Sequence, residues 1–156
     1  MNTQALVRPL LLPARFLDLL QPFVALATRV YVSWQFLISG WLKITSWENT
    51  LFLFQEEYRT PLLPPGVAAV FGTAGELVLP IFLILGLGGR LAALGLFAVN
   101  AMAVVSYAHV LLSEGFEAAL AQHYLWGFML LMLAVYGPGK LSLDALLGRG
   151  AARAGN

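Results

Sequence analysis

The chain has 156 residues, of which 60% are hydrophobic and only 11% are charged. This composition is too apolar for a soluble domain and indicates a membrane protein. The net charge of +1, without a dense basic cluster, gives nucleic-acid binding no support. Because the sequence contains no cysteine, disulfides, thiolate metal sites and dithiol redox relays are excluded.

Four windows are apolar enough for membrane-spanning helices, which need about 20 residues. They cover residues 22–44, 65–87, 90–112 and 118–136. The stretch GLGGR joins the second window to the third, and so short a connection requires an antiparallel hairpin. Between the first two windows, SWENTLFLFQEEYRTPLLPPG mixes apolar and charged residues, which predicts an amphipathic helix on the outer face.

The sequence therefore predicts an all-α membrane protein with a single membrane domain over residues 1–156. Its architecture is expected to be a four-transmembrane-helix antiparallel bundle with an amphipathic outer-loop helix between the first two spans, followed by a short tail at 137–156. Most basic residues lie on one side of the spans: Arg8, Arg15, Arg90, Lys140, Arg149 and Arg153. The positive-inside rule therefore places both termini in the cytoplasm.

Three polar residues are expected to form a layer inside the membrane. At 1.5 Å per residue, Glu76 lies about 15 Å from the cytoplasmic end of its span, Arg29 about 12 Å into the first span and Asn100 about 15 Å into the third. A charge at this depth costs roughly 2.5–3.5 kcal/mol. We therefore expect Arg29 to pair with Glu76, and Asn100 to complete their hydrogen bonds. Such a layer either fixes only the helix register or has a function, in which Glu76 and Arg29 contact the polar head of a lipidic substrate or carry protons.

A second polar group is expected at the outer mouth of the helices, where Lys43, Tyr107, His109 and His123 lie near the ends of their spans. A quinone head group is a candidate ligand near either histidine, with aromatic side chains stacking on it. The two histidines lack a diagnostic metal-ligand spacing, so no metal site is predicted. The sequence also lacks nucleotide-binding and nucleophile motifs, and no haem, flavin, iron–sulfur or nucleotide cofactor is expected.

Three stretches together resemble the DoxX family of small bacterial membrane proteins: RVYVSWQFLISGWLKI from Arg29, GELVLPIFLILGLGGRLAALGL from Gly75 and YGPGKLSLD from Tyr136. The resemblance implies a four-helix bundle in the bacterial inner membrane. Members are associated with thiosulfate:quinone oxidoreductase as a membrane subunit, with oxidative-stress complexes and with peptide-modification operons. The residues that match the family pattern are Arg29, Lys43, Glu76, Arg90 and 137–144.

Two functions follow as hypotheses. The first is a quinone- or lipid-interacting accessory subunit of a membrane redox system, whose primary catalytic centre lies in another protein. The alternative is a non-catalytic scaffold or anchor, in a peptide-modification or stress-response operon, that docks partner proteins through the outer-loop helix. Both require the lipid bilayer and either a partner protein or a second copy of the chain. No catalytic residue is assigned.

Overall fold

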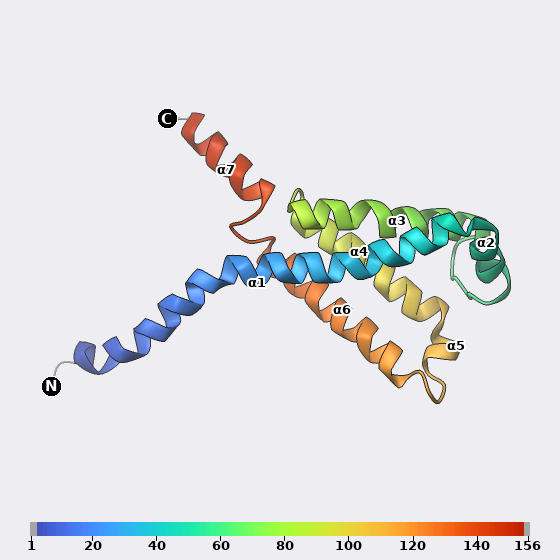
Figure 1. Cartoon of the computed structure of the whole chain (residues 1–156), viewed down its shortest axis with the longest axis horizontal. Helices are drawn as coiled ribbons and strands as arrows, with labels where there is room; N and C mark the ends of the chain where they lie inside the picture. The colour runs from blue at the N-terminus through green and yellow to red at the C-terminus, as the bar shows by residue number, and fades with distance from the viewer. Residues whose placement is uncertain (1–2, 155–156) are drawn as a thin grey trace.

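The computed structural model describes residues 3–154, with the side chains of residues 16–148. Within this part the chain is all-helical, as predicted, and contains no strand. The helices, labelled in Figure 1, are α1 (Thr3–Thr45), α2 (Trp47–Glu56), α3 (Pro65–Leu85), α4 (Gly89–Ser106), α5 (Ala108–Leu111), α6 (Glu117–Tyr136) and α7 (Leu143–Ala154).

Three of the described helices, α3, α4 and α6, are long and apolar enough to cross a membrane. They lie within or beside the windows that the sequence analysis selected, and they identify the chain as a membrane protein. The helix α1 does not meet the same criterion in its described part. Arg29, Gln35 and Lys43 lower the hydropathy of its central segment.

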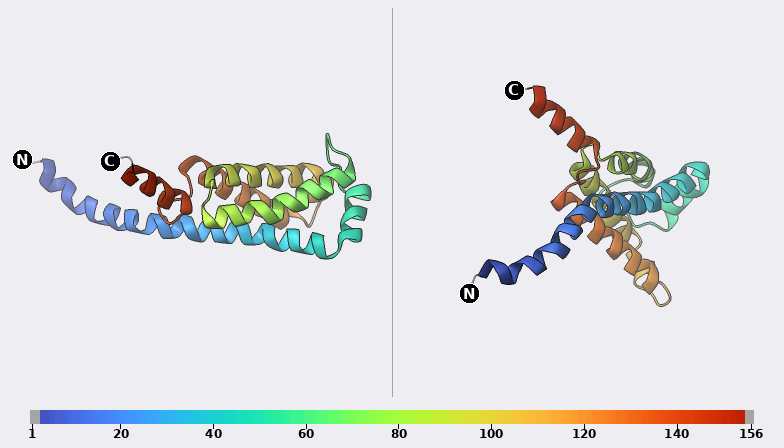
Figure 2. Two further views of the ribbon diagram at one scale, coloured as in Figure 1. Left: turned by 90° about the horizontal axis from the view of Figure 1, so that it is seen from above. Right: turned by 60° about the vertical axis from the view of Figure 1, so that its left-hand side comes forward.

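The four long helices pack in a closed order, with α1 against α3, α3 against α4, α4 against α6 and α6 back against α1. Their shared core contains Val32, Phe36, Leu83, Leu96 and Leu130. The N-terminal part of α1 and the helix α7 extend away from this packing (Figures 1 and 2). Residues 16–28 of α1 are accordingly mostly exposed, and α1 joins the packed core only from Arg29 onward.

The α1–α3 pair and the α4–α6 pair diverge toward the end where α2 lies (Figure 1). At the opposite end, α3 turns into α4 through Gly86 and Gly88, whose φ angles of 66° and 56° favour glycine. At the α2 end, Phe54 of α2 packs on Ala68 and Ala69 of α3. The apolar side of α2 is thus used inside the chain.

The helix α4 is shorter than the predicted span, which extended to residue 112. It ends at Ser106, and α5 starts after a break at Tyr107 (φ −113°, ψ 17°). The Ser106 carbonyl accepts a hydrogen bond from the backbone N–H of Arg59 at 2.9 Å. In an uninterrupted helix, this carbonyl would instead accept from the N–H of the residue four positions later. The loop after α2 is therefore tied to the end of α4.

Candidate functional site

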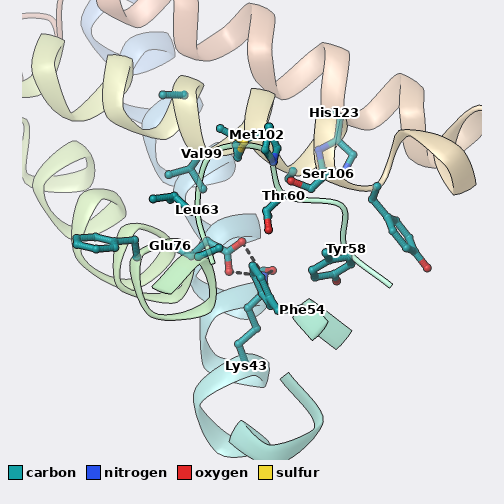
Figure 3. A pocket seen from close by; sticks show the side chains of 18 of the residues that line it. Lys43, Phe54, Tyr58, Thr60, Leu63, Glu76, Val99, Met102, Ser106 and His123 are labelled. Carbon is teal, nitrogen blue, oxygen red and sulfur yellow. Dashed lines mark hydrogen bonds and ion pairs between the residues drawn. The ribbon is translucent and has the colours of Figure 1, made fainter. Parts of the chain in front are cut away.

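A cavity of about 390 Å³ lies between α3 and α4 at the α2 end, where the helix pairs diverge (Figure 3). One wall is built by Glu76 of α3 and Lys43 of α1, while His123 of α6 forms another. The loop that follows α2 contributes Tyr58, Thr60, Pro61 and Leu63. The remaining lining is apolar or small: Phe54, Ala68, Phe71, Gly72, Ala98, Val99, Met102, Ala103 and Leu111 among others. The cavity combines an apolar interior with one charged corner.

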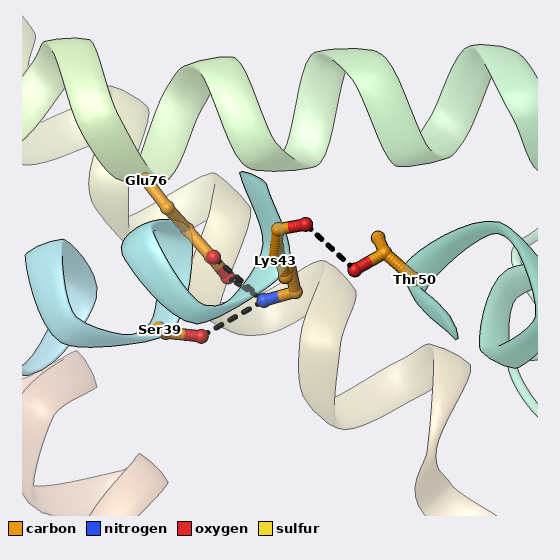
Figure 4. A network of polar contacts seen from close by, with 4 residues as sticks. All are labelled: Ser39, Lys43, Thr50 and Glu76. Atoms are coloured by element: carbon orange, nitrogen blue, oxygen red, sulfur yellow. Dashed lines mark hydrogen bonds and ion pairs between the residues drawn. The ribbon is translucent and has the colours of Figure 1, made fainter. Parts of the chain in front are cut away.

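The charged corner is an ion pair between α1 and α3 (Figure 4). Lys43 Nζ donates to both carboxylate oxygens of Glu76, at 2.7 Å and 2.6 Å, and to Ser39 Oγ at 2.8 Å. Gly40 allows this approach, since a Cβ there would lie 2.9 Å from Leu77 Cγ and 3.0 Å from Glu76 Cβ. The Gly-x-x-Lys pattern of α1 thus has a physical reason. Gly40 lets α1 approach α3 closely, and Lys43, about one turn further along α1, neutralises the Glu76 carboxylate.

The expected pairing of Arg29 with Glu76 is wrong. Arg29 is fully buried at the other end of the packed helices, and its Nη2 donates to the carbonyl of Leu141. It lies against Gly86, which is ten residues, or about 15 Å, along α3 from Glu76. The predicted depth of Arg29 was wrong because the first span was taken to begin near residue 22, whereas α1 joins the packed helices only at Arg29. There the guanidinium lies against Gly86 at the C-terminal end of α3, a position that favours a cation.

Asn100 does not bond to either member of the expected pair, but to His123 of α6. Its Nδ2 donates to the backbone carbonyl of His123 at 2.9 Å, and its Oδ1 lies 2.9 Å from His123 Nδ1. The Trp126 ring packs edge-on against His123, with centroids 5.0 Å apart. Asn100 therefore orients a residue of the cavity wall.

The structure combines residues from the two predicted groups into one site. Glu76 comes from the predicted polar layer, and Lys43, Tyr107 and His123 come from the predicted outer mouth, yet all four line the same cavity. His109 is exposed and is not among the lining residues, although its ring lies 5.5 Å from that of Tyr107.

One contributor, Tyr58, was not predicted from the sequence, because nothing local marks it. Ser39 precedes Lys43 by one helical turn, and helical spacing indicates it. Burial raises the pKa of the Tyr58 phenol, and the nearby Tyr107, Glu76 and Glu57 raise it further. Tyr107 also has a raised pKa, because of burial and its 3.2 Å hydrogen bond to Glu57. Both phenols therefore remain neutral hydroxyl groups at physiological pH.

The fold and the cavity define an all-helical membrane protein with a candidate ligand site among its helices. The DoxX family model matches residues 24–109, more than half of the chain, and the chain belongs to this family. The matched region includes Lys43, Glu76 and Asn100 but ends before His123. No curated protein and no solved structure matches the chain.

Proposed function

We propose that this DoxX protein is an accessory subunit of a membrane redox system and that it binds a quinone from the bilayer in the cavity beside Lys43 and Glu76. The observation that carries the proposal is the cavity itself, which is mostly apolar and whose polar groups are an ion pair, an imidazole and a few hydroxyl groups. In this proposal α1 crosses the inner membrane as a fourth span beside α3, α4 and α6. Both termini are cytoplasmic, as the distribution of Lys and Arg favours.

The cavity fits a quinone-type head group in size, and Lys43 offers a donor for one of its oxygens. A volume of about 390 Å³ is within the usual range for small-molecule sites, which are mostly apolar with a few placed polar groups. Lys43 makes two hydrogen bonds to one carboxylate, so it can exchange one of them for a ligand carbonyl without separating the ion pair. Phe54, Tyr58 and Phe71 provide aromatic surface for a planar ring.

The route into the cavity supports a ligand that comes from the bilayer. Three lining residues, Leu63, Phe71 and Met102, are exposed, and Phe71 reaches 67%. They lie where α3 and α4 part. Further along, the two helices are in close contact: a Cβ on Gly75 would lie 2.9 Å from Val99, and one on Gly95 would lie 2.9 Å from Leu79. In this proposal the ligand enters laterally between these exposed residues, and its apolar tail extends into lipid.

An accessory role fits the composition of the chain. Iron–sulfur clusters are held by cysteine thiolates, and this sequence has no cysteine. A partner protein would then carry the primary redox centre, while this chain supplies binding and orientation for the quinone.

The proposal is tested with protein purified from native membranes and with decylubiquinone as an added probe. We expect quinone in an organic extract of the protein. We also expect the probe, at 100 times its Kd, to raise the free energy of unfolding by about 2.7 kcal/mol, which is followed as a rise in melting temperature. Gly72→Leu should abolish this rise, because its side chain enters the cavity with Phe54 as the nearest neighbour, 3.6 Å from the new Cβ.

The matched control is Gly66→Leu in the same helix, where a Cβ meets nothing within 4 Å and the cavity is untouched. It should keep the full rise. An extract without quinone, together with no stabilisation by the probe, would refute quinone binding. Reproducible capture of a partner protein with such quinone-free material would instead support the scaffold alternative.

A further inference from the structure

His123 is held in one tautomer by Asn100. The amide nitrogen of Asn100 faces the His123 carbonyl, which only accepts hydrogen bonds, so the amide oxygen must be the atom that faces His123 Nδ1. An amide oxygen also only accepts. Nδ1 must therefore carry the hydrogen, and in the neutral ring Nε2 is left with a lone pair.

The Nε2 atom has no hydrogen-bond partner among the described residues, and the ring that carries it lines the cavity (Figure 3). The two charged groups of the wall differ in character from this nitrogen, and the remaining polar groups are hydroxyls, which both donate and accept. Lys43 offers an ammonium donor, and both oxygens of Glu76 accept from it. The cavity thus presents a hydrogen-bond donor on the α1–α3 side and an unused acceptor on the α6 side.

A ligand that spans these two walls needs one oxygen that accepts from Lys43 and another that donates to His123. A quinone has only acceptor oxygens, so its second carbonyl would place a lone pair against that of Nε2. The reduced quinol has two hydroxyl groups, each of which donates and accepts. We propose that His123, oriented by Asn100, makes the cavity selective for the reduced quinol over the oxidised quinone.

This proposal rests on the proposed function, because it assumes a quinone-type ligand. His123 acts here as a specificity-determining residue and Asn100 as the residue that positions it. Since one mismatched buried hydrogen bond corresponds to roughly a tenfold change in affinity, we expect the quinol to bind about tenfold more tightly.

The first experiment measures the tautomer and needs no ligand. The chain has two histidines, so a ¹⁵N-histidine-labelled His109→Gln protein reports only on His123. We expect Nδ1 to resonate as a protonated nitrogen and Nε2 as an unprotonated one. Asn100→Leu should shift both signals toward a tautomer mixture. If the His123 ring of this His109→Gln protein were protonated at Nε2 and unprotonated at Nδ1, the proposal would be overturned.

The second experiment compares the affinities of decylubiquinol and decylubiquinone for the same protein. His123→Gln should bring the affinity ratio close to one, because a glutamine side chain both donates and accepts. Asn100→Leu should also reduce the ratio, and His109→Gln, the control, should leave it unchanged. Equal affinities in the wild type, or an unchanged ratio in His123→Gln, would refute the selectivity. If neither form binds, quinone binding itself has failed, and the tautomer measurement still stands as the separate test of His123.

Discussion

The ion pair between Lys43 and Glu76 leads to a quantitative prediction for stability. The side chains are 19% and 9% exposed, and three hydrogen bonds converge on Lys43 Nζ. Lys43→Met would leave the Glu76 carboxylate buried without its cation. Removal of one partner of a buried pair costs about 3–5 kcal/mol, and we expect a loss in this range.

The double variant Lys43→Met/Glu76→Leu removes both charges. Replacement of a buried pair by apolar residues of similar volume is often neutral or stabilising, so this protein should be more stable than either single variant. The coupling energy from the four proteins should exceed about 2 kcal/mol, as expected for residues in direct contact. The measurement is the free energy of unfolding in mixed micelles, followed by loss of helical circular dichroism.

The matched control is a second cycle on Arg29→Gln and Glu76→Leu. Arg29 lies against Gly86, about 15 Å along α3 from Glu76, and distant sites add to within about 0.5 kcal/mol. We therefore expect additivity in this cycle. Additive effects for Lys43 with Glu76, or strong coupling between Arg29 and Glu76, would refute the assignment of the ion pair.

Two further substitutions test the end formed by the α3–α4 turn. Gly86→Ala places a methyl group against Arg29 Nη1 and Ser142 Cβ at a φ of +66°, so it should lower the melting temperature well below that of Gly115→Ala. The Gly115 control has a φ of +90° with nothing within 4 Å, and it should lose only the roughly 1–2 kcal/mol of left-handed strain. Equal losses would contradict the packing at Gly86. Asp144→Ala removes acceptors of the backbone N–H groups of Gly88 and Gly89, at 2.8 Å and 2.9 Å, and should cost about 0.5–2 kcal/mol. Faster hydrogen exchange at these two amides would show it, and unchanged exchange would count against the contact.

Much of the helical organisation could be predicted from local sequence. The helix α3 begins at Pro65, where its window begins, and α6 runs from Glu117 to Tyr136, beside the expected 118–136. Glycine-rich turns and long apolar runs act over neighbouring residues, so they can be read without knowledge of the partners. The DoxX resemblance used the same local patterns and is confirmed.

The end of α4 could not be predicted from local sequence. Residues 90–112 are apolar enough for one continuous helix, but the loop after α2 takes the carbonyl of Ser106 through the N–H of Arg59. That hydrogen bond joins residues 47 positions apart, and the hydrophobic periodicity of neither segment predicts it.

For the candidate site too, one part could be predicted from the sequence and another depends on the tertiary structure. The sequence by itself determined that Glu76, a carboxylate in an apolar helix, needs a polar partner, because an unpaired charge at that depth is costly. It did not determine which cation serves, since Arg29 and Lys43 lie fourteen residues apart on the same helix. The tertiary structure selects Lys43 because of how far α1 is shifted along its axis relative to α3. Gly40 lies in close contact with α3, which brings Lys43 to Glu76, while the part of α1 before Arg29 extends beyond the packed helices. The same packing placed Asn100 against His123, a contact that depends on how α4 meets α6.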